Sequence, residues 1–509
     1  MGVSRLKKVK KNILVGYINQ LITAVAAFAC RTIFIHQLDA AYLGINGLFT
    51  NMLGILSLAE LGFGTAMNFE MYKPVVEKDY SKIMALLRLY KKVYRLIGLF
   101  ILIGGILLTP FIRLLVGDPG DIGNYFVYYV LYIINTAVGY YSSYLLCLTN
   151  AEQDEYISSL FSMAQTLLAN ILEIFVLLVY RSFLLYLLVW LLSTILQQIF
   201  IQRYFRRNYS FIFLNYDTKL DANTKGHIKK NMGGLVVSKL SEVMLLQTDN
   251  IIIALGMNII SVGYADNYYL IVSYLKKIVL SLLKSVIPSL GNMVATESKE
   301  KGYEVFKVYD FVDYLIYSVL TICLIVVFQP FVAMWAGTEK IIDYWAMVLL
   351  SLSFYISGRN QGFMNYKTAH GIFYDMKITC IVSVLINIIV SMVGVFKFGL
   401  IGVYIGTCAS ELYSNIRNLR LSYSNITGEN LLKYYSKRVM QFVAIIVPII
   451  TLKYFSNILT PEEGWIKLIF FAFISFVVAL LWISLLFWRS AEYVYIRNVI
   501  KNELLRYKR

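Results

Sequence analysis

Six basic side chains interrupt long apolar stretches of this sequence: Arg31, Lys239, Lys276, Lys277, Lys284 and Arg359. At the centre of a bilayer each costs about 2.5–3.5 kcal/mol, so six that faced lipid would cost roughly 15–20 kcal/mol. We therefore expect them to reach an interface, pair with acids or line a hydrated cavity. A cavity lined by such groups would bind phosphate, because arginine donates through a planar fork and lysine supplies a compact charge.

Arg31 opens the apolar run RTIFIHQLDAAYLGINGLFTNMLGILSLAELGFGTA. It lies about 18 residues into a helix expected over 13–36, which corresponds to a rise of roughly 27 Å. In one interpretation its side chain reaches the outer interface or pairs with Asp39. In the other it is a cavity guanidinium that binds phosphate.

The next charged group lies in a helix expected over 231–256. Lys239 and Glu242 are three residues apart, a spacing that suits an ion pair within one helix. Asp249 follows in the same stretch and either couples an ion or neutralises a lysine. Lys239 is thus either a substrate-binding cation or half of a structural pair.

Lys277 and Lys284 are seven residues apart, about 700° of helical rotation, and therefore lie on nearly one face; Lys276 is some 80° away. This row of lysines either faces a hydrated cavity or belongs to a long helix that is partly outside hydrocarbon. Pro288 and Gly291 interrupt the stretch that follows, KSVIPSLGN, and predict a gate or hinge.

Arg359 lies in the polar segment SGRNQG, which would make a poor lipid-facing surface. We therefore expect Arg359 to face the cavity. Glu60 and Glu411 are acids in other expected spans; they either couple an ion or balance the charges of Arg31 and Arg359.

The elements that must position these residues are helices in a bilayer. The chain is 59% hydrophobic and only 15% charged, whereas soluble domains average about 25% charged residues. A spanning helix needs about 20 mostly apolar residues. About fourteen stretches meet this requirement: 13–36, 43–72, 93–115, 124–148, 157–180, 184–205, 231–256, 262–294, 308–335, 343–366, 376–396, 398–421, 439–457 and 466–488.

The basic residues orient these stretches, because cytoplasmic loops retain Lys and Arg. With the amino terminus inside, most of the 47 Lys and Arg residues fall in inside segments. Six fall outside: Arg113, Arg181, Lys340, Lys397, Lys453 and Lys467. Both termini are therefore expected in the cytoplasm. The net charge of +17 is explained by topology, and no nucleic acid is expected as a partner.

The chain resembles itself at an offset of about 218 residues. RTIF at 31–34 faces DNII at 249–252, and LLANIL at 167–172 faces VLINII at 384–389. Two parallel repeats of six spans are typical of a two-lobed transporter. We expect helices 1–6 at 1–205, a cytoplasmic linker at 206–230, helices 7–12 at 231–421, and helices 13–14 with a cytoplasmic tail at 422–509.

Enzyme signatures are missing from the sequence. It has three histidines, far apart, and no HExxH, CxxC or phosphate-binding glycine loop. We expect a protein that is not an enzyme and that needs no metal or other cofactor.

Several long runs resemble a known family: RTIFIHQLDAAYLGINGLFTNMLGILSLAELGFGTAMNFEMYKPVVEKD, LLQTDNIIIALGMNIISVGYADNYYLIVSYL, PSLGNMVA and FGLIGVYIGTCAS. They resemble bacterial polysaccharide flippases (PST/Wzx-like) of the multidrug/oligosaccharidyl-lipid/polysaccharide (MOP) superfamily. The resemblance implies an all-α MATE/lipid II flippase-like fold with two six-helix lobes and two extra carboxyl-terminal helices. It also favours a functional role for Arg31, because the family keeps an arginine ahead of this run. The lysines at 276, 277 and 284 depart from the family, which usually has polar residues there.

The resemblance further implies export of undecaprenyl-pyrophosphate-linked oligosaccharide repeat units by alternating access across the bacterial cytoplasmic membrane. Coupling to Na⁺, H⁺ or the membrane potential is expected, and other polysaccharide-assembly proteins are possible partners besides membrane lipids. Three alternatives stay open: a cation-coupled multidrug antiporter, a membrane-embedded polysaccharide polymerase or glycosyltransferase, and a non-transporting scaffold. The six basic residues in the spans count against the antiporter, and the short outside loops count against the polymerase.

Overall fold

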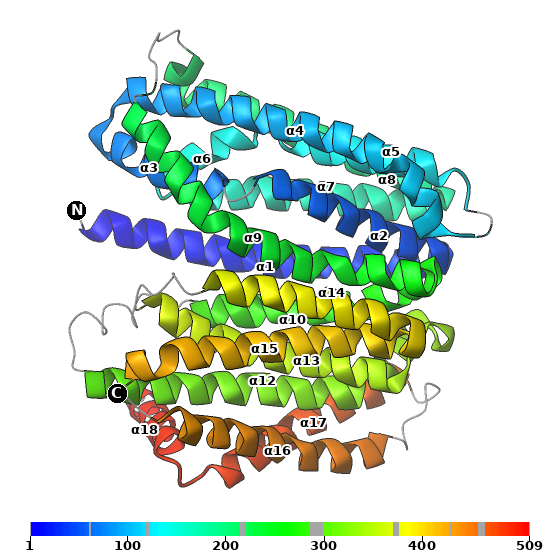
Figure 1. Ribbon diagram of the computed structural model, residues 1–509, viewed down its shortest axis with the longest axis vertical. Helices are drawn as coiled ribbons and strands as arrows, with labels where there is room; N and C mark the ends of the chain where they lie inside the picture. Colours follow the sequence, from blue (N-terminus) through cyan, green and yellow to red (C-terminus); the bar gives the residue numbers. More distant parts are fainter. Residues whose placement is uncertain are drawn as a thin grey trace. The chain divides into compact units, whose positions relative to one another are not determined.

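The all-helical fold expected from the sequence is confirmed. The computed structural model describes residues 2–60, 63–118, 120, 122–213, 220, 222–284, 299–369, 376–427, 430–456 and 464–507. Every regular element within these ranges is a helix (Figure 1). The chain divides into two compact units, Met1–Asp266 and Asn267–Arg509.

The first unit contains the amino-terminal helices. They are α1 (Gly2–Gln37), α2 (Ala40–Leu56), η1 (Ser57–Glu60), α3 (Phe63–Glu77), α4 (Tyr80–Val116), α5 (Tyr125–Gly139), α6 (Ser143–Ala151), α7 (Glu155–Tyr180), α8 (Phe183–Asn208), η2 (Ser210–Phe213), α9 (Ala222–Gly256) and the start of α10 (Ile259–Lys284). Helix α1 packs on α7, α2 packs on α9, and α5 packs on both α4 and α8. The buried rings of Phe49 and Tyr129, 5.1 Å apart, join α2 to α5.

Polar residues at the ends of these helices set where they begin. The Asn124 side chain accepts hydrogen bonds from the N–H groups of Phe126 and Val127 and so caps α5. Asp79 accepts from the N–H of Lys82 at 3.0 Å and caps α4. These bonds satisfy N–H groups that have no partner within the first turn of a helix.

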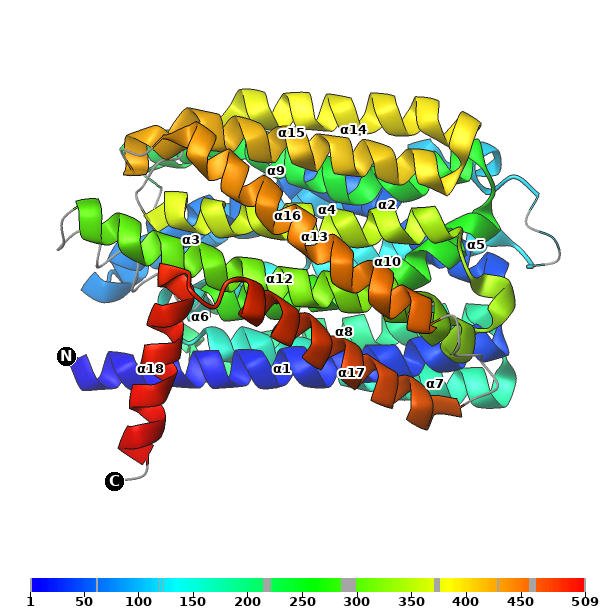
Figure 2. The same cartoon turned by 90° about the horizontal axis from the view of Figure 1, so that it is seen from below.

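The second unit contains the remaining helices. They are the rest of α10, α12 (Lys299–Ala336), η3 (Thr338–Lys340), α13 (Tyr344–Ala369), α14 (Met376–Phe398), α15 (Leu400–Thr427), α16 (Leu431–Ser456), α17 (Gly464–Leu486) and α18 (Ala491–Tyr507). Figure 2 shows α16 and α17 slanting across α12, and α18 running across the direction of α12. Helices α14 and α15 approach closely, because a Cβ on Gly406 would overlap the side chain of Ser391.

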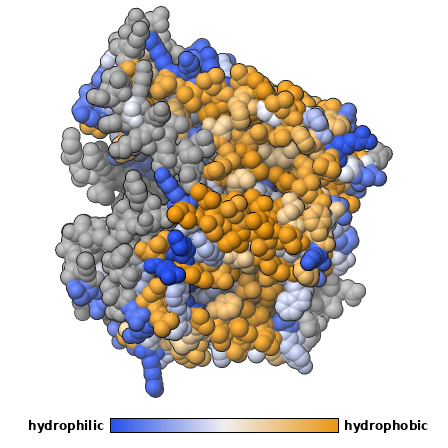
Figure 3. All heavy atoms as spheres, viewed as in Figure 1, coloured by the Kyte–Doolittle hydropathy of each residue, from blue (hydrophilic) through white to orange (hydrophobic). Residues whose placement is uncertain are grey.

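Ten helical segments among the described residues are long and apolar enough to cross a membrane. They belong to α1, α2 with η1, α4, α5 with α6, α7, α8, α12, α14, α16 and α17. The other four predicted stretches coincide with α9, α10, α13 and α15, which carry more charged and polar residues. On the face shown in Figure 3, apolar side chains cover the middle of the helices in each unit. The protein is therefore a multi-pass membrane protein.

The compact units divide at a different place from the predicted lobes. The sequence places the start of the second lobe at 231, whereas the first unit extends to Asp266. The reason is that α9 packs against α2, α3 and α4. Part of the predicted linker, from Ala222 onward, is the first turns of α9.

Candidate functional site

Arg31 forms an ion pair in the interior of the first unit. Its Nη2 lies 2.9 Å from Oδ2 of Asp266, and its side chain is 7% exposed. Arg31 is on α1 and Asp266 is the last residue of this unit, on α10. The structure shows Arg31 paired, with Asp266 rather than with Asp39 as the acid, and phosphate binding by Arg31 stays a prediction. The pair removes most of the cost of burying each charge alone.

A glycine face on α2 brings α10 close enough for this pair. A Cβ on Gly44 would overlap the backbone carbonyl of Ile259. A Cβ on Gly47 would lie 3.2 Å from the Asn250 side chain and 3.3 Å from that of Asp266. Glycine at these two positions therefore lets α2 pack directly against α9 and the start of α10, which places Asp266 beside Arg31.

Other polar groups lie in the same interior. The Tyr132 hydroxyl donates to the Asn46 side chain, which joins α5 to α2. The Cys30 thiol, one residue before Arg31, donates to a carboxylate oxygen of Glu173 on α7 at 3.4 Å. Tyr132 and Glu173 are both buried. The first unit thus encloses a polar cluster in which Arg31 and two acids lie on different helices.

Arg359 occupies the interior of the second unit. Its Nη1 lies 2.8 Å from Oδ2 of Asp313, and its Nη2 lies 3.0 Å from both carboxylate oxygens of Asp310. Nη1 also donates to the backbone carbonyl of Asp310 at 2.6 Å, and Nη2 donates to the side chain of Gln441 at 3.2 Å. Arg359 is 2% exposed, and both aspartates are buried.

Helix α16 completes this network. Arg438 donates to Oδ1 of Asp310 at 3.1 Å and to the backbone carbonyl of Arg359 at 3.1 Å. The Tyr434 hydroxyl also donates to Oδ1 of Asp310, at 2.9 Å. Two arginines and two aspartates therefore balance in charge while they tie α12, α13 and α16 together. We name this group of four residues, Arg359, Asp310, Asp313 and Arg438, the second-unit charge network.

The prediction that Arg359 faces a substrate cavity needs correction. Its guanidinium is enclosed by two carboxylates and a glutamine, so the contacts give it a structural role. The neighbouring glycines serve helix contact: a Cβ on Gly358 would overlap the Tyr317 ring, and one on Gly362 would lie 2.7 Å from Asp313. The acids that neutralise Arg359 are Asp310 and Asp313, not Glu411.

The other predicted site residues have varied surroundings. Glu60, in η1, accepts a hydrogen bond from the Tyr94 hydroxyl at 2.5 Å. Lys277 is exposed on α10, with its Nζ 5.1 Å from the centre of the Tyr274 ring. Asp249 on α9 and Glu411 on α15 are half-buried.

Four predicted residues fall outside what the structure describes. The side chains of Lys239 and Lys284 are outside the described set, as are Pro288 and Gly291 entirely. Their proposed roles as cavity cations and as a hinge stay predictions.

The sequence analysis missed the acids that matter most to this geometry: Asp266, Asp310 and Asp313. All three lie within predicted spans, at 262–294 and 308–335. An acid in a span costs about as much as a basic residue, so these positions carried the same signal as the six cations. The spacing of Asp310 and Asp313 on one helical face was a further signal for a paired arginine.

Comparison with known proteins supports the fold strongly at low sequence identity. No protein-family profile and no curated protein sequence matches the chain. Among solved structures, the lipid II flippase MurJ in an inward closed conformation matches with a TM-score of 0.66 at 15% identity, covering 93% of this chain and 99% of MurJ. The chain has the MurJ/MATE-like fold.

Two transporter structures support the same assignment. An inward-facing multidrug resistance MATE transporter of the MOP superfamily matches with a TM-score of 0.57 at 16% identity, over 83% of this chain and 99% of that one. A Vibrio cholerae MATE transporter matches with a TM-score of 0.51 at 15% identity, over 84% of this chain and 99% of its own. The MurJ/MATE-like fold thus places Arg31, Asp266 and the second-unit charge network in a membrane scaffold shared with transporters.

Proposed function

We propose that the protein is a flippase that exports undecaprenyl-pyrophosphate-linked oligosaccharide repeat units by alternating access, for capsular, exopolysaccharide or O-antigen-type polysaccharide synthesis. It would act in the bacterial cytoplasmic membrane with both termini in the cytoplasm. The similarity to the lipid II flippase supports a lipid-linked substrate, and the MOP-superfamily fold supports a transporter rather than an enzyme.

The observation that carries this proposal is the Arg31–Asp266 pair. Arg31 Nη2 lies 2.9 Å from Asp266 Oδ2, and the side chain of Asp266 remains 18% exposed. A pyrophosphate has more acceptor oxygens than one carboxylate and can engage the guanidinium fork in two parallel bonds. In the proposed cycle, pyrophosphate displaces Asp266 from Arg31 on loading, and Asp266 takes Arg31 back on release.

This exchange gives the empty carrier a way to keep Arg31 neutralised. An arginine left alone inside the unit would carry the penalty of an unpaired buried charge, about 3–5 kcal/mol. Asp266 avoids that penalty while the carrier is empty. Lys277, Lys239 and Lys284 remain proposed as further cations for the substrate, and Glu60, Asp249 and Glu411 as proposed groups for Na⁺ or H⁺ coupling or charge balance.

The test is flipping of a fluorescent, pyrophosphate-linked oligosaccharide in proteoliposomes. Arg31→Ala should reduce the flipping rate at least about tenfold, and Arg31→Lys should retain part of it because the charge remains. Arg113→Ala, an exposed arginine at the far end of α4, is the matched control and should flip at the wild-type rate. Wild-type flipping by Arg31→Ala would refute the proposal.

A cation-coupled drug antiporter is the second candidate, because MATE transporters share the fold. In that case Asp266 would hold an organic cation and Arg31 would be its resting partner. Efflux of a cationic dye that depends on Asp266, with no flipping of the lipid-linked sugar, would favour the antiporter over the flippase.

A further inference from the structure

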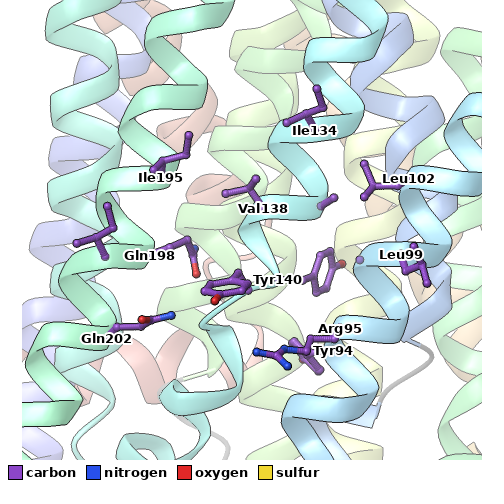
Figure 4. A pocket seen from close by; sticks show the side chains of 14 residues that line it. Tyr94, Arg95, Leu99, Leu102, Ile134, Val138, Tyr140, Ile195, Gln198 and Gln202 are labelled. Atoms are coloured by element: carbon purple, nitrogen blue, oxygen red, sulfur yellow. The ribbon is translucent and has the colours of Figure 1, made fainter.

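A groove of about 600 Å³ lies in the first unit, outside the Arg31 cluster. Its walls come from three places: α4, α5 with the α5–α6 connection, and α8. Figure 4 shows that its lining is divided by chemistry. Leu102, Ile134 and Val138 lie toward one end, whereas Arg95 and Gln202 lie toward the other.

The polar end of the groove carries positive charge. Arg95 is exposed, and its guanidinium lies 5.9 Å from the centre of the Tyr141 ring. Arg88, Lys91 and Lys92 lie with Arg95 and Leu99 around a second hollow on the same helix. Among the residues that the structure describes, none of these four cations forms an ion pair with a carboxylate. The patch therefore has four positive charges that no carboxylate among the described residues neutralises.

The apolar end continues into the part of α4 that crosses the membrane. Leu99 on α4 and Ile195 and Ile199 on α8 line the groove and are exposed. Along α4, Arg95 is followed by the uninterrupted apolar run 96–108, and the next basic residue is Arg113, near the end of the helix. This order runs from charge to hydrocarbon along a single helix, as it does from the headgroup to the acyl chains of a lipid.

We propose that this groove binds an anionic phospholipid of the surrounding bilayer, with its headgroup phosphate on Arg95 and an acyl chain along Leu99, Leu102 and Ile195. Charge complementarity selects the occupant, because basic pockets between membrane helices bind acidic headgroups. Gln202 and Tyr141 offer further donors at the same end of the groove. A zwitterionic lipid would bring a cationic group to a patch that is already positive, so it binds more weakly.

The proposed lipid would also lie beside the break between α5 and α6. The groove lies where α5 ends at Gly139 and α6 begins at Ser143. A lipid held by α4 and α8 would cover this break from the bilayer side. Its binding is therefore expected to stabilise the first unit, independently of any transported substrate.

The test is native mass spectrometry of the purified full chain, titrated with phosphatidylglycerol or phosphatidylcholine of the same chain length. The wild type should bind the first phosphatidylglycerol about tenfold more tightly than phosphatidylcholine, because both lipids offer a phosphate to Arg95 but only choline brings a positive charge to the basic patch. Arg95→Ala should abolish this preference. Arg420→Ala, an exposed arginine on α15, is the matched control and should keep it.

A second variant tests the acyl end. Leu99→Trp fills the groove from an exposed position, so folding is preserved while binding of both lipids falls. Equal affinities of the wild type for the two lipids, or an unchanged preference in Arg95→Ala, would overturn the proposal. Because the readout is bound lipid, its failure leaves the flippase proposal standing, and a failed flipping assay leaves this one standing.

Discussion

Two arginines in apolar helices have opposite surroundings, and the difference decides what each can do. Arg359 has five donor contacts, to Asp310, Asp313 and Gln441, and is 2% exposed. Arg31 pairs with Asp266, whose side chain is 18% exposed. A fully enclosed pair holds helices together, whereas a pair whose acid keeps access to solvent can exchange its partner at lower cost.

Removing Arg359 should destabilise the protein strongly. In Arg359→Met, Asp313 loses its ion-pair partner inside the second unit, and Asp310 keeps only Arg438. Breaking a buried pair costs about 3–5 kcal/mol, so we expect a clear fall in the thermal unfolding temperature measured in detergent. The double variant Arg359→Met with Asp313→Leu is the matched control, because it leaves one balanced pair. If the double variant were no more stable than the single one, charge pairing would not explain the loss.

The sequence analysis identified Arg31 and Arg359, the basic members of these pairs, but not the acids. All six cations were visible in the apolar stretches, and their cost required partners or water. The partner of Arg31 is 235 residues away, so pairing with Asp266 depends on how α1 and α10 fold together. The glycine positions on α2 permit that contact, but the sequence pattern alone does not say which helix they face.

At the scale of elements, a helix break inside the membrane leaves backbone N–H and carbonyl groups that need side-chain hydrogen-bond partners. The sequence predicts one span over 124–148, whereas the structure has α5 and α6 with a break at 140–142. Gln198 on α8 accepts from the Ser142 N–H at 2.8 Å and donates to the Gly139 carbonyl at 3.3 Å. Hydropathy could not reveal this break, because the residues on both sides of it are apolar.

Replacing Gln198 should therefore destabilise the backbone at the break between α5 and α6. Gln198→Leu roughly keeps the side-chain volume but leaves the Ser142 N–H without this partner, at a cost of several kcal/mol for a buried group in a membrane. The Gly139 carbonyl keeps the hydrogen bond from the Ser143 hydroxyl. Hydrogen–deuterium exchange should rise at 139–145. Gln197→Leu is the control on the same helix, since Gln197 donates instead to the Phe161 carbonyl. Unchanged protection at 139–145 in Gln198→Leu would contradict the assignment.

The attachment of α18 should depend on pH. Burial is the largest single influence and would raise the pKa of Glu492. The 2.7 Å hydrogen bond from Lys437 on α16, a hydrogen bond from the backbone and the positive charges of Lys437 and Lys307 together outweigh burial and hold that pKa below its usual 4.5. A carboxyl group with a depressed pKa stabilises the folded state above pH 4.5, and this contribution is lost as the pH falls through the lower folded-state value.

We therefore expect α18 to lose exchange protection as the pH falls below about 4.5. Glu492→Gln should remove this pH dependence and reduce protection at neutral pH. Glu304→Gln, at a charged position on α12 for which no ion pair with a basic residue is seen among the described residues, is the control. A pH profile of α18 that is the same in Glu492→Gln and the wild type would exclude this pair as the cause.

At the scale of the whole molecule, composition and hydropathy predicted the fold class well. The high apolar content required membrane helices, and each of the fourteen predicted stretches is helical over most of its described residues, although 43–72 and 124–148 each divide into more than one helix. The limits of the compact units were not predictable in the same way. Helix α9 joins the first unit through its packing on α2, and only tertiary contacts reveal that choice.

The membrane potential should drive the proposed export. A pyrophosphate that carries about two negative charges gains about 2.3 kcal/mol per charge per 100 mV on leaving an inside-negative compartment, or about 4.6 kcal/mol in total. This holds if the empty carrier returns uncharged, as the Arg31–Asp266 pair allows. In proteoliposomes, an inside-negative potassium diffusion potential set with valinomycin should accelerate outward flipping, and a reversed potential should slow it. In Asp266→Asn the positive charge of Arg31 moves out with the substrate and back with the empty carrier, so the net charge moved per cycle stays that of the substrate. The loaded carrier then has one negative charge fewer, so outward flipping in a single turnover should depend less steeply on the potential than in the wild type. Equal rates at both polarities in the wild type would show that the potential does not drive export, and would leave Na⁺ or H⁺ as the proposed source of energy.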